Sequence, residues 1–352
     1  MRFSLLTAFF AVVVASLATA QENTLRIKEV EQLTGHSTQR GVAVHGMALS
    51  RDGGRAAYVP RWEGGGRTGT HPPVVWDLAN GRLIGRLKGR GGEGSFDLAM
   101  SLSGDRIASE GQSGLYWWDI RTGAGAKLID SRTKFTVSGL HFSHNEKMLA
   151  SSHTSLQLFV WDLSTGKQLH ALDGAGGVTR FSSDDSQLAS ATPDLEVKIW
   201  NLQQKGFPER LKFDPGIPRQ AQVKGIRGMV KVRARVRAME FYSDDSIIHA
   251  LAGLSGAPFH YQRWDVESGK SVHTGTVGRR PTCATLLPDG RTAILGDADG
   301  SVELWNLEKG KMISGSRSHS KQVAGIAVSQ DGKRVLTGGY DLKVVFHELK
   351  SN

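Results

Sequence analysis

The feature that most constrains this chain is a short apolar segment that recurs at a nearly constant spacing. Each copy carries an aromatic residue, a polar residue and a turn, as in "VVWDLANG", "LFVWDLSTG" and "VELWNLEKG". The spacings are 42, 43, 39, 64, 41 and 41 residues between Trp76, Trp118, Trp161, Trp200, Trp264, Trp305 and Phe346. A tight turn rich in Gly, Asp or Ser precedes each aromatic residue. A period of about 40 residues, built from short strands and turns, predicts propeller blades of four strands each.

The two ends of the chain complement each other. The last repeat stops after its third strand, and a strand-like segment, "TLRIKEVEQLTGH" (24–36), stands before the first repeat. Pairing of this segment with the last blade would close the ring and remove an open sheet edge. We therefore predict an all-β fold: a seven-bladed β-propeller of four-stranded blades, closed by the N-terminal strand, with residues 21–352 as one domain.

The last repeat, "SHSKQVAGIAVSQDGKRVLTGGYDLKVVFHEL", resembles the WD40 repeat family, and the resemblance extends over almost all of residues 24–352. It places His319, Thr337 and Asp341 where that family has a His–Ser/Thr–Asp–Trp hydrogen-bond set, with Phe346 in the Trp position. Because the repeated Trp residues hold a fixed place in apolar strands, we interpret them as packing between blades, not as ligand-stacking residues. The resemblance implies a rigid platform that binds proteins or peptides through one face and its central opening.

The first 20 residues have the pattern of a secretory signal. One basic residue is followed by an apolar run and by Ala18-Thr19-Ala20, which predicts cleavage after Ala20. An uncleaved anchor is the alternative, and no later apolar run is long enough to cross a bilayer. We expect a secreted or periplasmic protein. Cys283 is the single cysteine, so no intrachain disulfide can form, and its strand-like surroundings predict a buried small side chain.

The positive charge is concentrated in one segment. The chain has 44 Lys and Arg against 34 Asp and Glu, and residues 205–237 carry ten of these cations and two of these anions, or +8 of the net +10. The sequence "MVKVRARVR" alternates apolar and basic residues, which predicts an extended strand leading into blade five. Its cations would share one side and project above the ring: Lys231, Arg233, Arg235 and Arg237. Such a row either guards a strand edge against pairing or docks an anionic partner.

Three insertions interrupt the blades, at residues 63–73, 214–236 and 253–260. In the WD40 arrangement all three fall on one face, which would be the binding side; the alternative is that they are tolerated loop decorations. A protein or peptide is the expected partner, with an acidic protein or an anionic polysaccharide fitting the charge. Nucleic acid is disfavoured because residues 214–236 lack base-stacking aromatics, and we expect a monomer. The predicted partner-binding residues are Arg67, His71, Arg227, Lys231, Arg233, Arg235 and Arg237.

A second hypothesis is an exported propeller enzyme, such as a lactonase, lyase or hydrolase, acting at the central channel. The first strands of the blades offer candidates that could face the channel: His45, Asp97, His141, Arg180 and Glu240. The chain has no nucleophile-elbow, zinc-protease or Walker motif, and its two G-x-G-x-x-G matches do not join a strand to a helix. We favour the non-enzymatic platform and assign no catalytic residue, cofactor or metal.

Overall fold

The structure of the protein is a computed structural model. It describes residues 26–350 apart from 34–40, 65–66, 71–72, 88–96, 112–113, 131–136, 175, 205–207, 214–219, 226–227 and 243. The predicted signal, residues 1–20, therefore lies outside the described residues. The described part consists of strands and turns, and it contains no helix long and apolar enough to cross a membrane.

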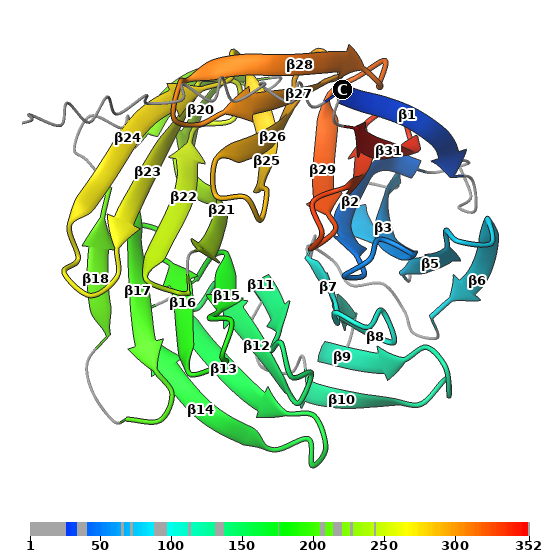
Figure 1. Ribbon diagram of the computed structural model, residues 1–352. Coiled ribbons are helices and arrows are strands. Elements are labelled where there is room, and N and C mark those ends of the chain that lie inside the picture. The colour runs from blue at the N-terminus through cyan, green and yellow to red at the C-terminus, as the bar shows by residue number, and fades with distance from the viewer. Residues whose placement is uncertain are drawn as a thin grey trace, which may run out of the picture.

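Seven antiparallel sheets form a closed ring, so the prediction of a seven-bladed β-propeller is confirmed (Figure 1). The innermost strands of blades one to seven are β2 (Gly41–Leu49), β7 (Leu98–Met100), β11 (Val137–Phe142), β15 (Thr179–Phe181), β21 (Arg235–Tyr242), β25 (Pro281–Leu286) and β29 (Val323–Val328). The second strands are β3 (Arg55–Gly64), β8 (Arg106–Gly111), β12 (Met148–His153), β16 (Gln187–Ala191), β22 (Ile247–Gly253), β26 (Thr292–Asp297) and β30 (Arg334–Gly339).

The two outer strands complete each blade. The third strands are β5 (Val74–Asp77), β9 (Gly114–Asp119), β13 (Gln157–Asp162), β17 (Glu196–Asn201), β23 (Phe259–Asp265), β27 (Ser301–Asn306) and β31 (Val344–Lys350). The outermost strands are β6 (Arg82–Arg86), β10 (Gly125–Asp130), β14 (Gln168–Asp173), β18 (Glu209–Lys212), β24 (Ser271–Val277), β28 (Lys311–Arg317) and β1 (Arg26–Leu33). Strand β4 (Arg67–Thr70) extends blade one, and β19 (Gln220–Gly225) pairs with β20 (Gly228–Arg233) as a separate hairpin.

The ring is closed by the predicted N-terminal strand. Strand β1 pairs antiparallel with β31, from Arg26 opposite Lys350 to Leu33 opposite Val344. The last blade is therefore built from both ends of the described chain, as Figure 1 shows where the blue and red strands meet. No blade is left with three strands, so this sheet edge is covered by the chain itself.

The core of the protein lies between neighbouring blades. Trp264 of blade five packs with Leu211 and Phe213, which come from blade four. Trp76 of blade one packs with Leu336 of blade seven in the same way. Four of the repeated indoles are buried, at Trp76, Trp161, Trp200 and Trp264, whereas Trp118 and Trp305 are half-buried. Each repeated Trp thus packs against the preceding blade, and all seven apolar clusters of the described residues lie between two blades.

The register of blade seven corrects one sequence assignment. In the other blades, the Trp lies two positions before a residue whose N–H bonds back to the turn after the first strand. That residue is Leu163 after Trp161, and in blade seven it is Leu349 after His347. His347, and not Phe346, therefore holds the Trp position. The sequence assignment chose Phe346 because phenylalanine resembles tryptophan more closely than the neighbouring histidine does. The difference of one residue matters because adjacent side chains in a strand point to opposite faces.

His347 completes the polar set of blade seven. Thr337 Oγ1 lies 2.9 Å from Nε2 of His319 and 2.9 Å from Nε2 of His347, so the second imidazole replaces the missing indole. His319 Nδ1 in turn lies 3.0 Å from Asp341 Oδ1. Burial opposes ionisation of Asp341, but hydrogen bonds from His319 and the Ser320 N–H lower the pKa of this carboxyl. The set links three segments of the last blade in its buried interior.

Blades three and four offer a matched test of this hydroxyl position. Ser151 Oγ accepts a hydrogen bond from Trp161 Nε1 at 2.9 Å and lies 3.0 Å from His153 Nε2. Ser190, at the same place in blade four, is equally buried, but its Oγ has no hydrogen-bond partner among the residues that the structure describes.

We expect Ser151→Ala to lower the free energy of unfolding by about 2–3 kcal/mol, because it leaves a buried indole N–H without an acceptor. Ser190→Ala removes the same atom without breaking a bond, so its effect should stay within about 0.5 kcal/mol. Urea unfolding followed by tryptophan fluorescence measures both. Equal losses in the two variants would show that the hydroxyl network does not stabilise blade three.

Turns between the first and second strands join neighbouring blades. Asp185 Oδ1 accepts a hydrogen bond from the His144 N–H at 2.7 Å, which links blades three and four. Asp245 Oδ2 accepts from the Ser183 N–H at 2.8 Å, which links blades four and five. Arg106 of blade two donates to the Glu146 carbonyl at 2.6 Å. Blades two to five are thus fixed relative to one another by hydrogen bonds as well as by their apolar contacts.

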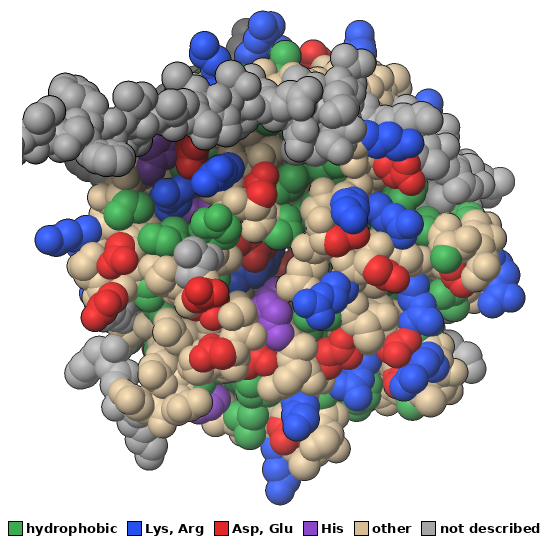
Figure 2. Space-filling model, viewed as in Figure 1, with side chains coloured by type: hydrophobic (Ala, Val, Ile, Leu, Met, Phe, Trp, Pro, Cys, Tyr) green, Lys and Arg blue, Asp and Glu red, His purple; other side chains and the backbone are tan. Residues whose placement is uncertain are grey.

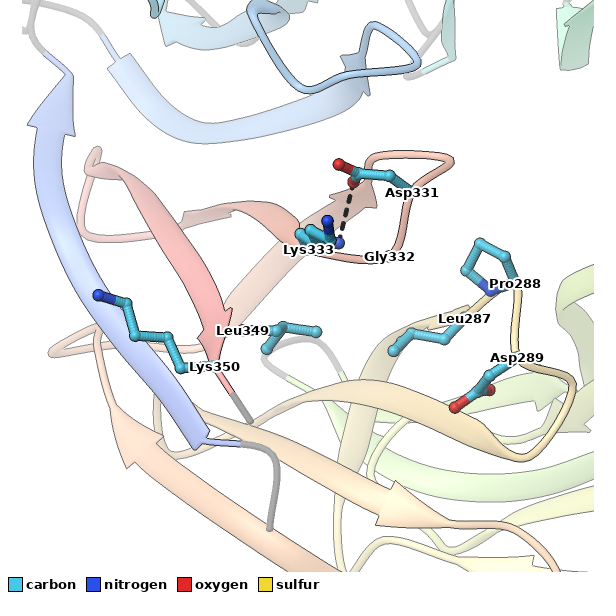
Figure 3. Close-up of a pocket in the computed structure, with 8 residues that line it drawn as sticks. All are labelled: Leu287, Pro288, Asp289, Asp331, Gly332, Lys333, Leu349 and Lys350. Atoms are coloured by element: carbon cyan, nitrogen blue, oxygen red, sulfur yellow. Dashed lines mark hydrogen bonds between the residues drawn. The ribbon is translucent and has the colours of Figure 1, made fainter. Parts of the chain in front are cut away.

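The corresponding turns of blades six and seven are separated by a groove of 530 Å³ (Figure 3). Leu287 and Pro288 line it from blade six, and Asp331 of blade seven bonds to the Lys333 N–H at 3.0 Å within its own turn. Among the described residues, no hydrogen bond joins the two turns. Blades six and seven are held by an apolar cluster that includes Leu349 and by the Thr282 hydroxyl, which donates to the Val323 carbonyl at 2.6 Å between their innermost strands.

Candidate functional site

The central channel has a volume of 770 Å³ and is lined by the innermost strand of every blade. Figure 2 shows histidine and charged side chains in the hollow at the centre of the molecule. The lining is asymmetric, because equivalent register positions hold small residues in three blades and polar ones in three others. The small residues are Ala48, Ala99 and Ala327, and the polar ones are His141, Arg180 and Glu240.

The charged side of the channel contains an ion pair. Arg180 Nε lies 2.6 Å from Glu240 Oε1, and the same guanidinium donates to the Thr179 carbonyl at 2.8 Å. Asp97 of blade two also lines the channel. The sequence proposed five channel candidates, and the structure places four of them in the lining: Asp97, His141, Arg180 and Glu240. The fifth, His45, lies in strand β2.

Burial shifts the ionisation of two channel residues. It raises the pKa of Asp97, with Arg180 acting in the opposite direction. It lowers the pKa of His141 well below its usual value, and the nearby Arg180 and His144 lower it further. His141 is therefore neutral at pH 7, and its Nδ1 accepts a hydrogen bond from the Phe181 N–H at 3.2 Å, which leaves the proton on Nε2.

The sequence analysis missed channel residues outside the regular strand pattern. His144 lies in the turn after β11 and lines the channel, with its Nδ1 3.3 Å from Asp185 Oδ1. Cys283 packs against an apolar cluster as a small side chain, as predicted, but it is half-buried in the channel lining and not buried. Burial raises the pKa of its thiol to about 12, which leaves the thiolate unpopulated at neutral pH.

The basic segment is extended, as predicted, but its first part is one strand of a β-hairpin and not an unpaired strand. Its first part, β20, pairs antiparallel with β19, from Gln220 opposite Arg233 to Gly225 opposite Gly228. Lys231 lies in β20 opposite Gln222. Residues 63–73 likewise include a strand, β4, which begins at Arg67 opposite Gly64 of β3. The two remaining candidates, His71 and Arg227, lie outside the described residues.

The alternation predicted for the basic segment ends at a β-bulge. Arg233 and Arg235 are exposed, and Ala234 and Val236 are 2% and 7% exposed. The pairing with β22 then shifts between Val236 and Ala238, so the intervening residue, Arg237, leaves the alternating pattern. Arg237 is half-buried and lines the channel. The prediction that all four cations share one exposed side is therefore wrong for Arg237.

The insertions lie at the same end of the blades. Arg235 at the start of β21 is opposite Gly253, where the 253–260 connection begins. Gly41 at the start of β2 is opposite Trp62, next to the 63–73 insertion. All innermost strands run in the same direction through the ring, so these ends belong to one face, which we call the insertion face. Within the described residues, no group of three or more His, Cys, Asp or Glu is placed to hold a metal ion.

Comparison with known proteins supports the repeat assignment. The family model described as "WD domain, G-beta repeat" (WD40) matches residues 166–201 and 310–347, which run from β14 to β17 and from β28 to β31. The angio-associated migratory cell protein of Homo sapiens is 27% identical over 189 residues, which are 52% of this chain and 38% of the relative.

Two further relatives match longer stretches of this chain. Autophagy-related protein 16 of Arabidopsis thaliana is 24% identical over 230 residues, 64% of this chain and 32% of the relative. U3 small nucleolar RNA-associated protein 12 of Saccharomyces cerevisiae is 25% identical over 227 residues, 64% of this chain and 22% of the relative. The chain matches between 22 and 38% of the length of these three relatives. The protein is thus a seven-bladed propeller with sequence similarity to WD40 repeat proteins.

Proposed function

We propose that the protein is an exported, non-enzymatic interaction platform that binds a protein partner through its insertion face. Similarity to WD-repeat relatives and the closed ring favour a rigid scaffold over a mobile catalyst. The observation that carries the proposal is the pair of exposed cations on that face. Arg233 and Arg235 form no ion pair within 4.0 Å among the described residues, so their charge is available to a partner.

The partner on this proposal is an acidic protein surface, with an anionic polysaccharide as the alternative. Arg presents a planar fork of donors that matches a carboxylate, and unpaired surface charge raises the rate of encounter with an oppositely charged surface. The export part rests on the signal pattern of residues 1–20 alone. It predicts a mature chain that starts at Gln21, which an intact-mass measurement of the secreted protein checks.

A capture experiment tests the platform. Residues 21–352 are immobilised as the native sequence, as Arg233→Gln/Arg235→Gln, and as a control with equal charge loss, Lys167→Gln/Arg210→Gln. The control residues are exposed on the outer side of blades three and four. We expect a partner from native extract to elute from the native and control chains at the same salt concentration, and from the first variant at a lower one. If the partner elutes from all three chains at the same salt concentration, Arg233 and Arg235 do not contribute to its binding.

The channel supports a second candidate, an enzyme such as a lactonase, lyase or hydrolase. The observation in its favour is that Asp97, His141, Arg180 and Glu240 do line one cavity, and that burial raises the pKa of Asp97. The ion pair between Arg180 and Glu240 leaves Asp97 as the candidate acid or base. Hydrolysis of lactones or esters that disappears in Asp97→Asn would establish this function. If the native chain hydrolyses neither, the interaction platform is the one remaining candidate function.

A further inference from the structure

Arg237 is a cation placed inside the channel. The β-bulge between Val236 and Ala238 takes it out of the exposed alternation, and it lines the same cavity as Thr282 and Cys283 of blade six. Its guanidinium carbon lies 5.7 Å from the ring centre of Phe259, which supports it from within blade five. The bulge and the ring together hold the guanidinium at the wall of the cavity.

Arg237 has no partner for its charge among the described residues. Its Nε is buried without a hydrogen-bond acceptor, and no carboxylate of the described residues forms an ion pair with it. Burial, and after it the nearby Arg235, lower the pKa of the Arg237 guanidinium. The other channel arginine differs, because Arg180 is paired with Glu240 at 2.6 Å. Keeping a desolvated cation without a counter-charge costs stability, which is typical of a residue kept to bind a ligand.

More cations lie at the mouth of the channel near Arg237. Arg279 and Arg280 are exposed immediately before β25, the strand that neighbours β21 in the ring. Arg233 and Arg235 are exposed at the start of β21. Innermost strands run in the same direction, so these four side chains stand at the insertion-face end of blades five and six. Among the described residues, none of the four forms an ion pair within 4.0 Å.

We propose that Arg237 binds the carboxylate of an acidic side chain that a partner peptide inserts into the channel from the insertion face. The inference rests on the proposed platform and specifies its partner. A peptide fits better than a small acid, because the unpaired cations form a path from the rim to Arg237 that one carboxylate cannot cover. Each exposed arginine would meet a further acidic residue of the peptide, and Arg237 would take the one that enters the cavity.

The test uses a fluorescein-labelled hexaglutamate peptide and a hexaglutamine control, with affinity measured by fluorescence anisotropy. Four chains are compared: native, Arg237→Met, Arg233→Gln/Arg235→Gln, and Arg210→Gln as a control for charge lost on the outer side of blade four. We expect hexaglutamate to bind the native and Arg210→Gln chains equally, and Arg237→Met at least about 10-fold more weakly. Arg233→Gln/Arg235→Gln, which lacks the exposed cations at the channel mouth, should bind hexaglutamate a few-fold more weakly than the native chain and with a flatter salt dependence.

Thermal unfolding separates a ligand-binding role from a structural one. If Arg237 awaits a ligand, Arg237→Met should unfold at the same temperature as the native chain or higher, because an unpaired buried cation is removed. A clear fall in Tm would mean that the guanidinium stabilises the fold, and would overturn the proposal. Saturating hexaglutamate should raise the Tm of the native chain and leave that of Arg237→Met unchanged.

The remaining outcomes distinguish this inference from the platform itself. If Arg233→Gln/Arg235→Gln loses peptide binding while Arg237→Met binds the peptide as tightly as the native chain, the channel site is overturned. The insertion face would then remain as the docking surface. Failure of hexaglutamate to bind the native chain would overturn both the acidic partner of the insertion face and the carboxylate site at Arg237. If glutarate binds the native chain as tightly as hexaglutamate does, and Arg237→Met binds neither, the ligand of this site is a small dicarboxylate and not a peptide.

Discussion

A chain that lacks residues 24–33 is expected to lose its cooperative thermal transition and to aggregate. Removing β1 takes away the ladder of seven residue pairs with β31 and leaves the edge of that strand open. At a net value of about 1 kcal/mol per hydrogen bond, the loss approaches the whole stability of an ordinary domain, about 5–15 kcal/mol. Circular dichroism and size-exclusion chromatography measure the transition and the association state.

The matched control removes a hairpin that does not close the ring. Strands β19 and β20 share six residue pairs, nearly as many as β1 and β31, but among the described strands they pair only with each other. Replacing residues 220–231 by a short Gly/Ser linker removes both partners together and opens no blade. We expect this variant to stay monomeric, with a Tm within a few degrees of the native value. If both deletions behave alike, loss of strand pairing in general, and not ring closure, determines stability.

The repeat pattern predicts the fold because the same local rule applies seven times. Each blade needs an apolar third strand to bury against its neighbour, so Trp76 and Trp264 mark equivalent places without any long-range information. The pattern fails where one residue decides the register. Phe346 looks like the better substitute for Trp, but Thr337 requires a polar ring beside it, and His347 provides that ring. Hydrogen bonding inside the blade outweighs the aromatic match.

The site was harder to predict than the fold for a physical reason. Strand alternation gives the side of each residue only while the pairing is regular, and one extra residue in β21 moves Arg237 from the exposed edge into the channel. Nothing in "KVRARVRA" reveals that bulge. By contrast, Arg180 and Glu240 could be proposed as channel candidates, because they lie one and two residues before the last paired position of the first strand, where the pairing with the second strand is regular.

Acidification between pH 6.5 and pH 4 is expected to destabilise the protein strongly, because His141 and three buried histidines stay neutral in the folded chain. Burial lowers the pKa of His153 and His249 to about 4 and that of His347 to about 3. The unfolded chain protonates these rings near their ordinary pKa of about 6.5, so in this range it binds more protons than the folded chain. The stability they provide is fully present above pH 6.5 and is lost as the pH falls.

The size of the acid effect follows from the shifts. Each ring that remains neutral reduces stability by about 1.4 kcal/mol per pH unit below 6.5, so at pH 5 His153, His249 and His347 alone remove about 6 kcal/mol, and His141 adds to that loss. That loss is comparable to the total stability of many domains, about 5–15 kcal/mol. Urea unfolding at half-unit steps from pH 7.5 to pH 4.5 should therefore show a midpoint that is flat above pH 7 and then falls steeply.

His249→Phe tests whether the histidines cause the fall. This ring lies between Tyr242 and Tyr261, with centroids 5.9 and 6.2 Å away, and its Nδ1 has no hydrogen-bond partner among the described residues. A phenyl ring preserves the aromatic contacts and cannot be protonated. The slope of stability against pH near pH 5 should drop by about one quarter, since three of the four strongly shifted rings remain. An unchanged slope would mean that His249 is protonated as readily in the folded chain as in the unfolded one, and that acid acts through the carboxylates instead.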